Sequence, residues 1–435
     1  MFNGKQFIIT VYTVLKRHYP DFNDLLDSIP DHRKRKTYEV AEIIMAGLHM
    51  FIFKRGSRNN ADNGISGEFE NNYIKLFGLR LPIMDSVNVF LKNLRPEELE
   101  KLKREVVQRL IEKKVLNNYR YQNRYIVAID GTGMFTFDYE PFPGCPHKTS
   151  KKGKTTWQAY VLEAKILGSN GFSISLATEW LRNSDNIDKK QDCELKAFTR
   201  LAAKIKKMYP RLPIIVAADS LFPNQTVFNI CKGYDWRFIL TFKEGTLKSV
   251  WQEVGLLYRL MEKENKTERP LCKDKQGWLK ETIMFINDID YKKFQLNWIE
   301  YTKSYTHKQD HENHFVHVTD MKINNENAFD ISFYGRLRWK IENEGFNTQK
   351  NGGYNLQHKF SRKNFYAMQN YYQLLQVAHL ITQLTEKLKL IKNKVKETGR
   401  TIKSIWEDMF AAILKETFAQ NEIDGLYTKT KQLRY

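Results

Sequence analysis

Two aspartates each follow a short, uncharged run that is rich in β-branched residues. Residues 125–129 precede Asp130, and residues 213–218 precede Asp219. Both runs predict buried strands with an acid at the carboxyl end. Two carboxylates held close together repel each other, and a bound divalent cation removes that cost. Because Mg²⁺ prefers oxygen ligands and leaves positions for water and phosphate, this pair favours phosphodiester chemistry.

A third acid, Glu342, lies in residues 333–346, a stretch whose apolar pattern predicts a helix. Arg338 precedes Glu342 by one helical turn, so both side chains share a face and the guanidinium can bind a phosphate beside the metal ions. Glu344 is the competing third acid, but no arginine stands four residues before it. Each acid alone is more simply interpreted as a solvated or helix-capping carboxylate, and only the combination favours chemistry.

Three segments carry a resemblance to a known family: Ile-Asp-Gly-Thr at 129–132, Ala-Asp-Ser-Leu-Phe-Pro-Asn at 218–224 and Arg-Trp-Lys-Ile-Glu at 338–342. Together they resemble the DDE transposases of bacterial insertion sequences, and the match spans most of the expected catalytic core. The resemblance implies that Asp130, Asp219 and Glu342 are the catalytic residues. It also implies that they hold two Mg²⁺ ions, with Mn²⁺ as a possible substitute.

The same resemblance implies an α/β fold with an RNase H-like mixed-sheet core, which a β-rich insertion interrupts before the last acid. The family's third motif consists of Tyr, Arg, Glu and Lys at set spacing. Arg338 and Glu342 keep that spacing, whereas Tyr334 lies one residue too far upstream and Lys350 one too far downstream. By resemblance, Arg338, Tyr334 and Lys350 contact DNA.

Members of this family bind the terminal inverted repeats of double-stranded DNA, usually as homodimers. They cleave and rejoin strands by in-line attack at phosphorus, first by water and then by a freed 3′ hydroxyl on target DNA. Some relatives stack an extruded base on an aromatic residue of the insertion. Trp298, in the strand expected at 294–301, is our candidate, and an ordinary cross-strand packing aromatic is the alternative interpretation.

The composition favours a polyanionic partner. The chain has 70 Lys and Arg against 50 Asp and Glu, a formal net charge of +20, and such side chains are almost never fully buried. Nucleic acid, an anionic membrane surface and acidic proteins all fit this charge, and nucleic acid is the first expectation. Two basic clusters are expected to contact phosphates, with simple solvation as the alternative: Arg33, Lys34, Arg35 and Lys36, and then Lys151, Lys152 and Lys154 in the loop 148–154.

The length of 435 residues exceeds what one hydrophobic core usually holds. We expect a helical, DNA-binding N-terminal domain at 1–120, the first part of the core at 121–245, a β-rich insertion at 246–330, the last part of the core at 331–390 and a helical tail at 391–435. Helices are expected at 96–111 and 193–209, a hairpin at 161–168 and 172–177, and a strand at 236–242. A long amphipathic helix is expected to place on one face Tyr371, Leu374, Leu375, Ala378, Ile381 and Leu384.

The sequence shows no sign of export or of a membrane partner. The apolar run 41–53 is too short to span a bilayer and predicts a buried helix. The first residues lack the features of a signal peptide, so a cytoplasmic, nucleoid-associated protein is expected. The four cysteines form no paired motif and are expected to be free thiols: Cys145, Cys193, Cys231 and Cys272.

Three alternatives remain open. A transposase-derived DNA-binding protein without activity would share the basic charge, although all three acids are present. A purely hydrolytic, metal-dependent nuclease would use the same site. A glycosidase that uses two of the acids needs no metal, and the net charge of +20 argues against it.

Overall fold

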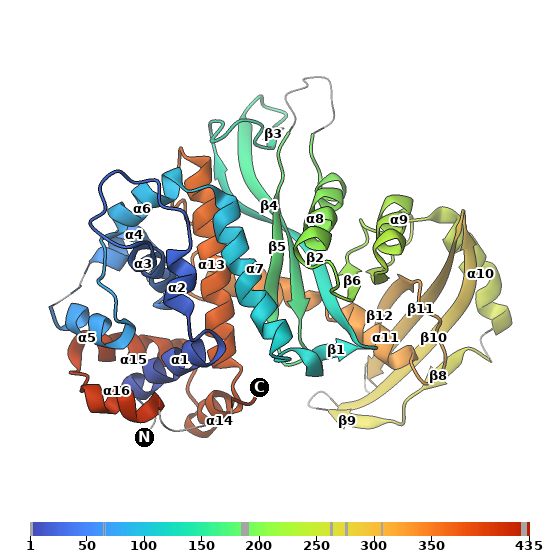
Figure 1. Cartoon of the computed structure of the whole chain (residues 1–435). Coiled ribbons are helices and arrows are strands. Elements are labelled where there is room, and N and C mark those ends of the chain that lie inside the picture. Colours follow the sequence, from blue (N-terminus) through green and yellow to red (C-terminus); the bar gives the residue numbers. More distant parts are fainter. Residues whose placement is uncertain are drawn as a thin grey trace.

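The computed structural model describes residues 3–63, 65, 67–183, 191–261, 264–274, 277–305, 308–427 and 433–435. It confirms the α/β class: a mixed sheet runs through the molecule between a body of helices and an outlying group of strands (Figure 1). We call helices α1–α7 and α13–α16 the helical body, and helix α10 with strands β8–β12 the wing.

The helical body joins the two ends of the chain. Its first helices are α1 (Gly4–His18), α2 (Phe22–Asp27), α3 (Val40–Ile52), α4 (Arg58–Asp62), α5 (Gly67–Phe77), α6 (Met84–Asn93) and α7 (Pro96–Glu112). Its last are α13 (Phe365–Glu386), α14 (Lys389–Thr398), α15 (Ile402–Lys415) and α16 (Gln420–Tyr427). The predicted helix at 96–111 is confirmed as α7, with Pro96 at its first position, where no backbone N–H is needed.

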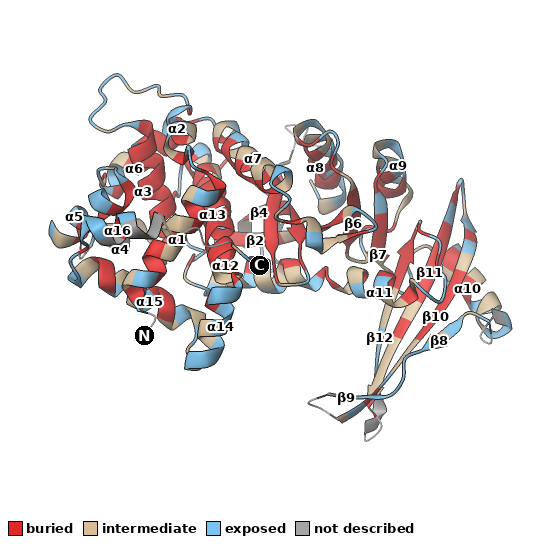
Figure 2. Cartoon of the chain, turned by 60° about the horizontal axis from the view of Figure 1, so that its bottom comes forward, coloured by how far each residue is buried: buried red, intermediate tan, exposed pale blue. Residues whose placement is uncertain are grey.

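Helix α13 contacts helices α1, α3, α6 and α7 of the helical body and also strand β5 of the sheet. The prediction of a single apolar face is wrong, because α13 is buried all round from Asn370 to Thr385 (Figure 2). Several of its polar side chains form hydrogen bonds inside the protein, although the amide oxygens of Asn370 and Gln373 have no partner among the described residues. The Asn370 side chain donates to the carbonyls of Leu91 and Leu94, each at 2.8 Å, so the helix can be polar and still be buried.

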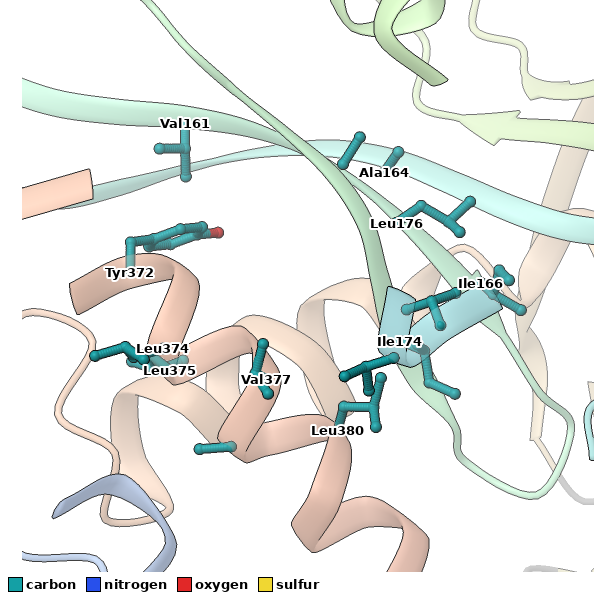
Figure 3. Close-up of a cluster of buried hydrophobic side chains, with 14 of the residues drawn as sticks. Val161, Ala164, Ile166, Ile174, Leu176, Tyr372, Leu374, Leu375, Val377 and Leu380 are labelled. Atoms are coloured by element: carbon teal, nitrogen blue, oxygen red, sulfur yellow. The ribbon is translucent and has the colours of Figure 1, made fainter. Parts of the chain in front are cut away.

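The face of α13 toward the sheet combines polar contacts, such as Gln383 with the Ser173 backbone, with an apolar layer. Figure 3 shows Tyr372, Leu375, Val377 and Leu380 of α13 near residues of two strands. These strand residues are Val161, Ala164, Ile166, Ile174 and Leu176. Each fully buried side chain of this size contributes about 1.5–3 kcal/mol, so this layer joins the helical body firmly to the sheet.

The central strands are β1 (Arg120–Tyr121), β2 (Arg124–Phe137), β3 (His147–Thr149), β4 (Thr155–Leu167), β5 (Ser173–Trp180), β6 (Ile214–Ala218) and β7 (Arg237–Thr241), and the short helix η1 (Asn117–Tyr119) precedes them. Strands β4 and β5 confirm the predicted hairpin. Strand β2 pairs antiparallel with β4 and parallel with β6, and β6 pairs parallel with β7. Helices α8 (Glu194–Met208) and α9 (Gln225–Tyr234) connect the later strands.

The wing extends the same sheet. It consists of α10 (Lys248–Met261), β8 (Lys266–Glu268), β9 (Cys272–Asp274), β10 (Gly277–Tyr291), β11 (Phe294–Tyr305) and β12 (Lys308–Thr319). Strand β12 pairs antiparallel with β7, so the strands expected between 246 and 330 continue the central sheet beyond its last parallel strand. The chain then returns below the sheet as α11 (Ala328–Arg336), the π-helix η2 (Ile341–Asn347) and α12 (Thr348–Asn351).

The prediction of a single helix over 333–346 is wrong, because this segment is divided between two helices. Helix α11 ends at Arg336, and a turn separates it from η2. Glycine at position 345 explains the close packing of η2: a Cβ there would lie 2.9 Å from the Ser173 hydroxyl oxygen on β5. In the part of the chain that the structure describes, no helix is both long and apolar enough to cross a membrane.

Candidate active site

The two predicted aspartates lie where the parallel pairing of β2 with β6 ends. Ile129 of β2 pairs with Ala218, the last residue of β6, and Asp130 and Asp219 are the next residues in the chain. The prediction that the first strand ends at Asp130 is wrong. Strand β2 continues to Phe137 because its other edge still pairs with β4, where Gly131 lies opposite Leu162. Only the parallel pairing ends at the two acids, and this brings them to neighbouring positions.

Arg338 joins the third predicted acid to the first. Its Nη1 lies 3.2 Å from Oδ2 of Asp130 and 2.8 Å from Oε1 of Glu342. The arginine side chain is 8% exposed and that of Asp130 is 15% exposed, whereas that of Glu342 is 41% exposed. The guanidinium is therefore a buried cation between two carboxylates, one of which faces solvent.

Glu344, the competing third acid, lies elsewhere. Its carboxylate accepts a hydrogen bond from the Lys340 ammonium at 3.0 Å, and its Cγ lies 3.6 Å from where a Cβ of Gly171 would be, in the turn between β4 and β5. The geometry thus brings Glu342, and not Glu344, to Asp130.

Burial dominates the electrostatics of Asp130. It raises the pKa of this carboxyl to about 7, with Glu342 adding to the rise while Arg338 and the Gly131 backbone N–H oppose it. A carboxylate that is costly to ionise in its own protein is stabilised by a nearby positive charge. A cation that bound here would meet one buried acid, Asp130, and one exposed acid, Glu342, which now share the same nitrogen of Arg338.

Glu194 and Tyr160 belong to the same cluster, and the sequence interpretation missed them. The Tyr160 hydroxyl donates to Oε1 of Glu194 at 2.6 Å. Burial raises the pKa of Glu194, and the charge of Asp219 raises it further. The nearest signal in the sequence is Gly131, since a Cβ there would lie 2.3 Å from Oε1 of Glu194. The Asp-Gly pair therefore leaves room for a side chain from α8.

The donor set fits a hard divalent cation. Asp130, Asp219, Glu194 and Glu342 offer only carboxylate oxygens, which Mg²⁺ and Mn²⁺ prefer to nitrogen or sulfur. Among the described residues, no three Asp, Glu, His or Cys side chains are already arranged to hold a metal ion. The guanidinium of Arg338 bonds to both Asp130 and Glu342.

Among the described residues, the other side chains predicted to contact DNA form no hydrogen bond or ion pair with Asp130 or Glu342. Tyr334 is half-buried and stacks on Tyr121, with ring centroids 4.4 Å apart. Lys350 is half-buried on α12. Trp298 is 2% exposed in the wing and packs edge-on against Trp251 and Tyr258. A base could stack on Trp298 only after the wing rearranged.

The two predicted basic clusters differ in how many of their side chains form ion pairs and how many are exposed. Arg33 is bound by Asp31 and by the Tyr38 carbonyl, and Lys36 lies 3.5 Å from Asp31. Lys34 and Arg35 are exposed. Exposed lysines also surround the turn between β3 and β4: Lys148, Lys151, Lys152 and Lys154.

All four cysteines are free, as predicted: Cys145 and Cys231 are buried, and Cys193 and Cys272 are exposed. Burial and the charge of Glu140 raise the pKa of Cys145 to about 12, so its thiol is a poor metal ligand in this state.

A comparison of the chain with models of known protein families found no match, and a comparison with curated proteins found none either.

Proposed function

We propose that this chain is a DDE-type DNA transposase that binds the ends of an insertion sequence and carries out metal-dependent strand cleavage and strand transfer. One observation carries the proposal. Asp130 and Asp219 follow paired residues of two parallel strands, and Glu342, from a segment more than a hundred residues later, is bound to Asp130 through Arg338. The sequence motifs and the tertiary contacts thus point to the same three acids.

The strand order supports an RNase H-like core. The order β5-β4-β2-β6-β7 combines an antiparallel hairpin with parallel partners on the other side of β2. The acids lie on the central strand β2 and directly after its parallel neighbour β6. On this proposal, the wing is the β-rich insertion between the second and third acids.

Each residue then has a chemical task. Asp130, Asp219 and Glu342 would hold two Mg²⁺ or Mn²⁺ ions, which supply charge neutralisation and activation of the attacking and leaving oxygens. Cations at the two carboxylates would replace the charge of Arg338, so that its guanidinium could turn to the phosphate that is cut. A planar guanidinium binds two phosphate oxygens at once, which a lysine cannot do.

The partners follow from the same proposal: double-stranded DNA with terminal inverted repeats, target DNA and a second copy of the chain in the DNA complex. The net charge of +20 supports a polyanion. A cytoplasmic, nucleoid-associated location is part of the proposal.

The test is cleavage of duplex DNA that carries the ends of the element encoding this chain, with Mg²⁺ or with EDTA. We expect Mg²⁺-dependent cuts at the ends. Loss of a residue that merely supports a metal ligand costs about 10–100-fold, so Asp130→Asn and Glu342→Gln should each lower the rate by more than about 100-fold. Glu344→Gln is the matched control and should cut within a few-fold of the wild type.

The outcomes separate the alternatives. Binding of the ends without any cutting would favour a DNA-binding protein that has lost its activity. Cutting without joined products would favour a nuclease, and cutting in EDTA would exclude the two-metal mechanism. If Glu344→Gln were the inactive variant, the third acid would have to be reassigned.

A further inference from the structure

A hollow of about 800 Å³ lies at the end of the helical body where α13 begins. Its walls come from α4, α6 and the loop between α12 and α13 (Figure 1). The cationic side chains in this wall are Arg58, Lys92, Lys359, Arg362 and Lys363, whereas burial and the neighbouring arginines lower the pKa of His358 and favour its neutral form. None of the lining residues is an acid, although Arg58 forms an ion pair at 3.3 Å with the exposed Asp85.

The cations of this hollow are largely uncompensated. In the described part of the chain, the side chains of Lys92, Arg362 and Lys363 form no hydrogen bond or ion pair, and all three are exposed. Lys359 lies over the ring of Phe137, 4.5 Å from its centroid. Like charges gathered in a concave wall repel one another and concentrate anions there, because the walls focus the field.

The loop that carries these cations is held in place. Tyr139 donates from its hydroxyl to the Arg362 carbonyl at 3.1 Å, Ser361 donates to the Asn364 carbonyl at 3.2 Å, and the Asn364 side chain caps α13. Phe360 is buried against Tyr371. The cations therefore stand on a fixed backbone, which lowers the entropy cost of binding.

The hollow also lies at a defined distance from the candidate active site. Strand β2 connects them, with Asp130 on one side and Phe137, under Lys359, on the other. A strand advances about 3.3 Å per residue, so Phe137 is at most about 23 Å from Asp130, and the bulge between Gly133 and Phe135 shortens this span. At 3.4 Å per base pair, this corresponds to at most about seven base pairs of duplex.

We infer that this hollow binds the phosphate backbone of double-stranded DNA within about seven base pairs of the phosphodiester that is cut. The inference rests on the proposed function for the position of the cut. The hollow supplies a sequence-independent contact, since lysine and arginine at phosphates carry no base information. It is separate from both basic clusters that the sequence indicated.

The experiment measures binding of the full chain to a labelled duplex of about 30 base pairs, in EDTA, over a series of salt concentrations. The variant is Lys92→Gln combined with Arg362→Gln and Lys363→Gln. The matched control removes three exposed lysines of α14, at the far end of α13 (Figure 1): Lys389→Gln, Lys392→Gln and Lys396→Gln. Thermal unfolding of both variants checks that the fold is retained.

We expect the slope of log affinity against log salt to fall by about 3 in the hollow variant, or about 0.9 per lost phosphate contact. The α14 control should keep the slope of the wild type. Equal slopes in all three proteins, or equal losses in both variants, would overturn the inference.

Because binding is measured in EDTA, it does not depend on catalysis. A wild type that binds through the hollow but never cuts would keep this inference and remove the proposed activity. If the wild type cuts DNA but the hollow variant binds DNA with an unchanged salt slope, the proposed activity would stand and this inference would be overturned.

Discussion

Arg338 is buried and binds two acids of the candidate site. Its guanidinium donates to Asp130 and to Glu342, and it also lies over the ring of Trp339 at 4.9 Å. Without it, two carboxylates would face each other across a partly buried space. The arginine thus neutralises the acids when no metal is bound, and it competes with any cation for the same oxygens.

This competition predicts how Arg338→Gln behaves. In EDTA the variant should be less stable than the wild type by about 1–3 kcal/mol, because two charged hydrogen bonds are lost. Proton uptake by Asp130 limits the loss, since it removes one of the two negative charges. Mg²⁺ should raise its melting temperature more than that of the wild type, since ligand binding to the folded state stabilises it. The measurement is thermal unfolding with and without Mg²⁺.

Arg336→Gln is the control, because Arg336 lies over the ring of Tyr301, at 3.9 Å, and holds no acid of the site. Its response to Mg²⁺ should match that of the wild type. An equal Mg²⁺ response in Arg338→Gln would show that Arg338 does not compete for the metal site.

At the scale of elements, the π-helix η2 decides which acid reaches Asp130. It packs against β2 and β5, and Gly345 allows the approach to Ser173. The next element is tied down as well: the Gln349 side chain on α12 donates to Gln376 of α13 at 2.9 Å, and Gln376 accepts from the buried Lys165 ammonium at 3.0 Å. Burial lowers the pKa of Lys165 to about 8.

A side chain added at position 345 should disturb this packing. Gly345→Ala would place a Cβ 2.9 Å from the Ser173 hydroxyl oxygen, and overpacking of this kind costs about 1–3 kcal/mol. Ser173→Ala should relieve the clash in the double variant, since that hydroxyl is buried and has no hydrogen-bond partner. Urea unfolding and DNA cleavage would measure both effects.

Gly255→Ala on α10 is the matched control, because no atom lies within 4 Å of its added Cβ. It should be neutral or stabilising by up to about 1 kcal/mol, since alanine favours a helix more than glycine does. Failure of Ser173→Ala to rescue Gly345→Ala would mean that the contact on β5 does not position η2.

At the scale of the whole molecule, buried neutral histidines are spread over the helical body and the sheet. Burial lowers the pKa of His49 on α3 to about 3, and of His317 on β12 to about 3. Burial also lowers the pKa of His18 on α1 to about 4 and, with nearby lysines, that of His379 on α13. Each must stay neutral in the folded chain.

The protein should therefore lose stability in acid. A histidine of the unfolded chain, with an ordinary pKa near 6.5, binds a proton at a pH where the buried histidine stays neutral. The free energy of unfolding therefore falls as the pH drops below about 6.5, and it levels off near the pKa of the folded state. For a shift from 6.5 to about 3, the loss at pH 5 is about 2 kcal/mol per histidine.

The double variant His49→Phe, Tyr73→Phe isolates one contribution. The His49 ring and the Tyr73 hydroxyl bind each other at 2.8 Å, so replacing both leaves no unpaired group. The variant's loss of stability between pH 7 and pH 5, measured by urea unfolding, should be smaller than the wild type's by about 2 kcal/mol. An unchanged pH dependence would show that His49 is not kept neutral by burial.

Sequence patterns alone determined much of this protein, because they depend on local physics. The uncharged strands before Asp130 and Asp219, the hairpin of β4 and β5, and the helix α7 follow from propensity and spacing. The four-residue interval from Arg338 to Glu342 also placed these two side chains together, although a π-helix, and not one long α-helix, carries the acid.

Only the tertiary structure decided the rest, because it depends on residues far apart in the chain. The choice of Glu342 over Glu344 follows from the packing of η2 on β2 and β5, and Glu194 enters the site from α8 through space that Gly131 leaves open. The sequence of helix α13 predicts an amphipathic helix, yet α13 is buried all round because the N-terminal helices and the sheet pack on it. The basic hollow likewise combines residues 58, 92 and 358–363, and no local pattern could have joined them.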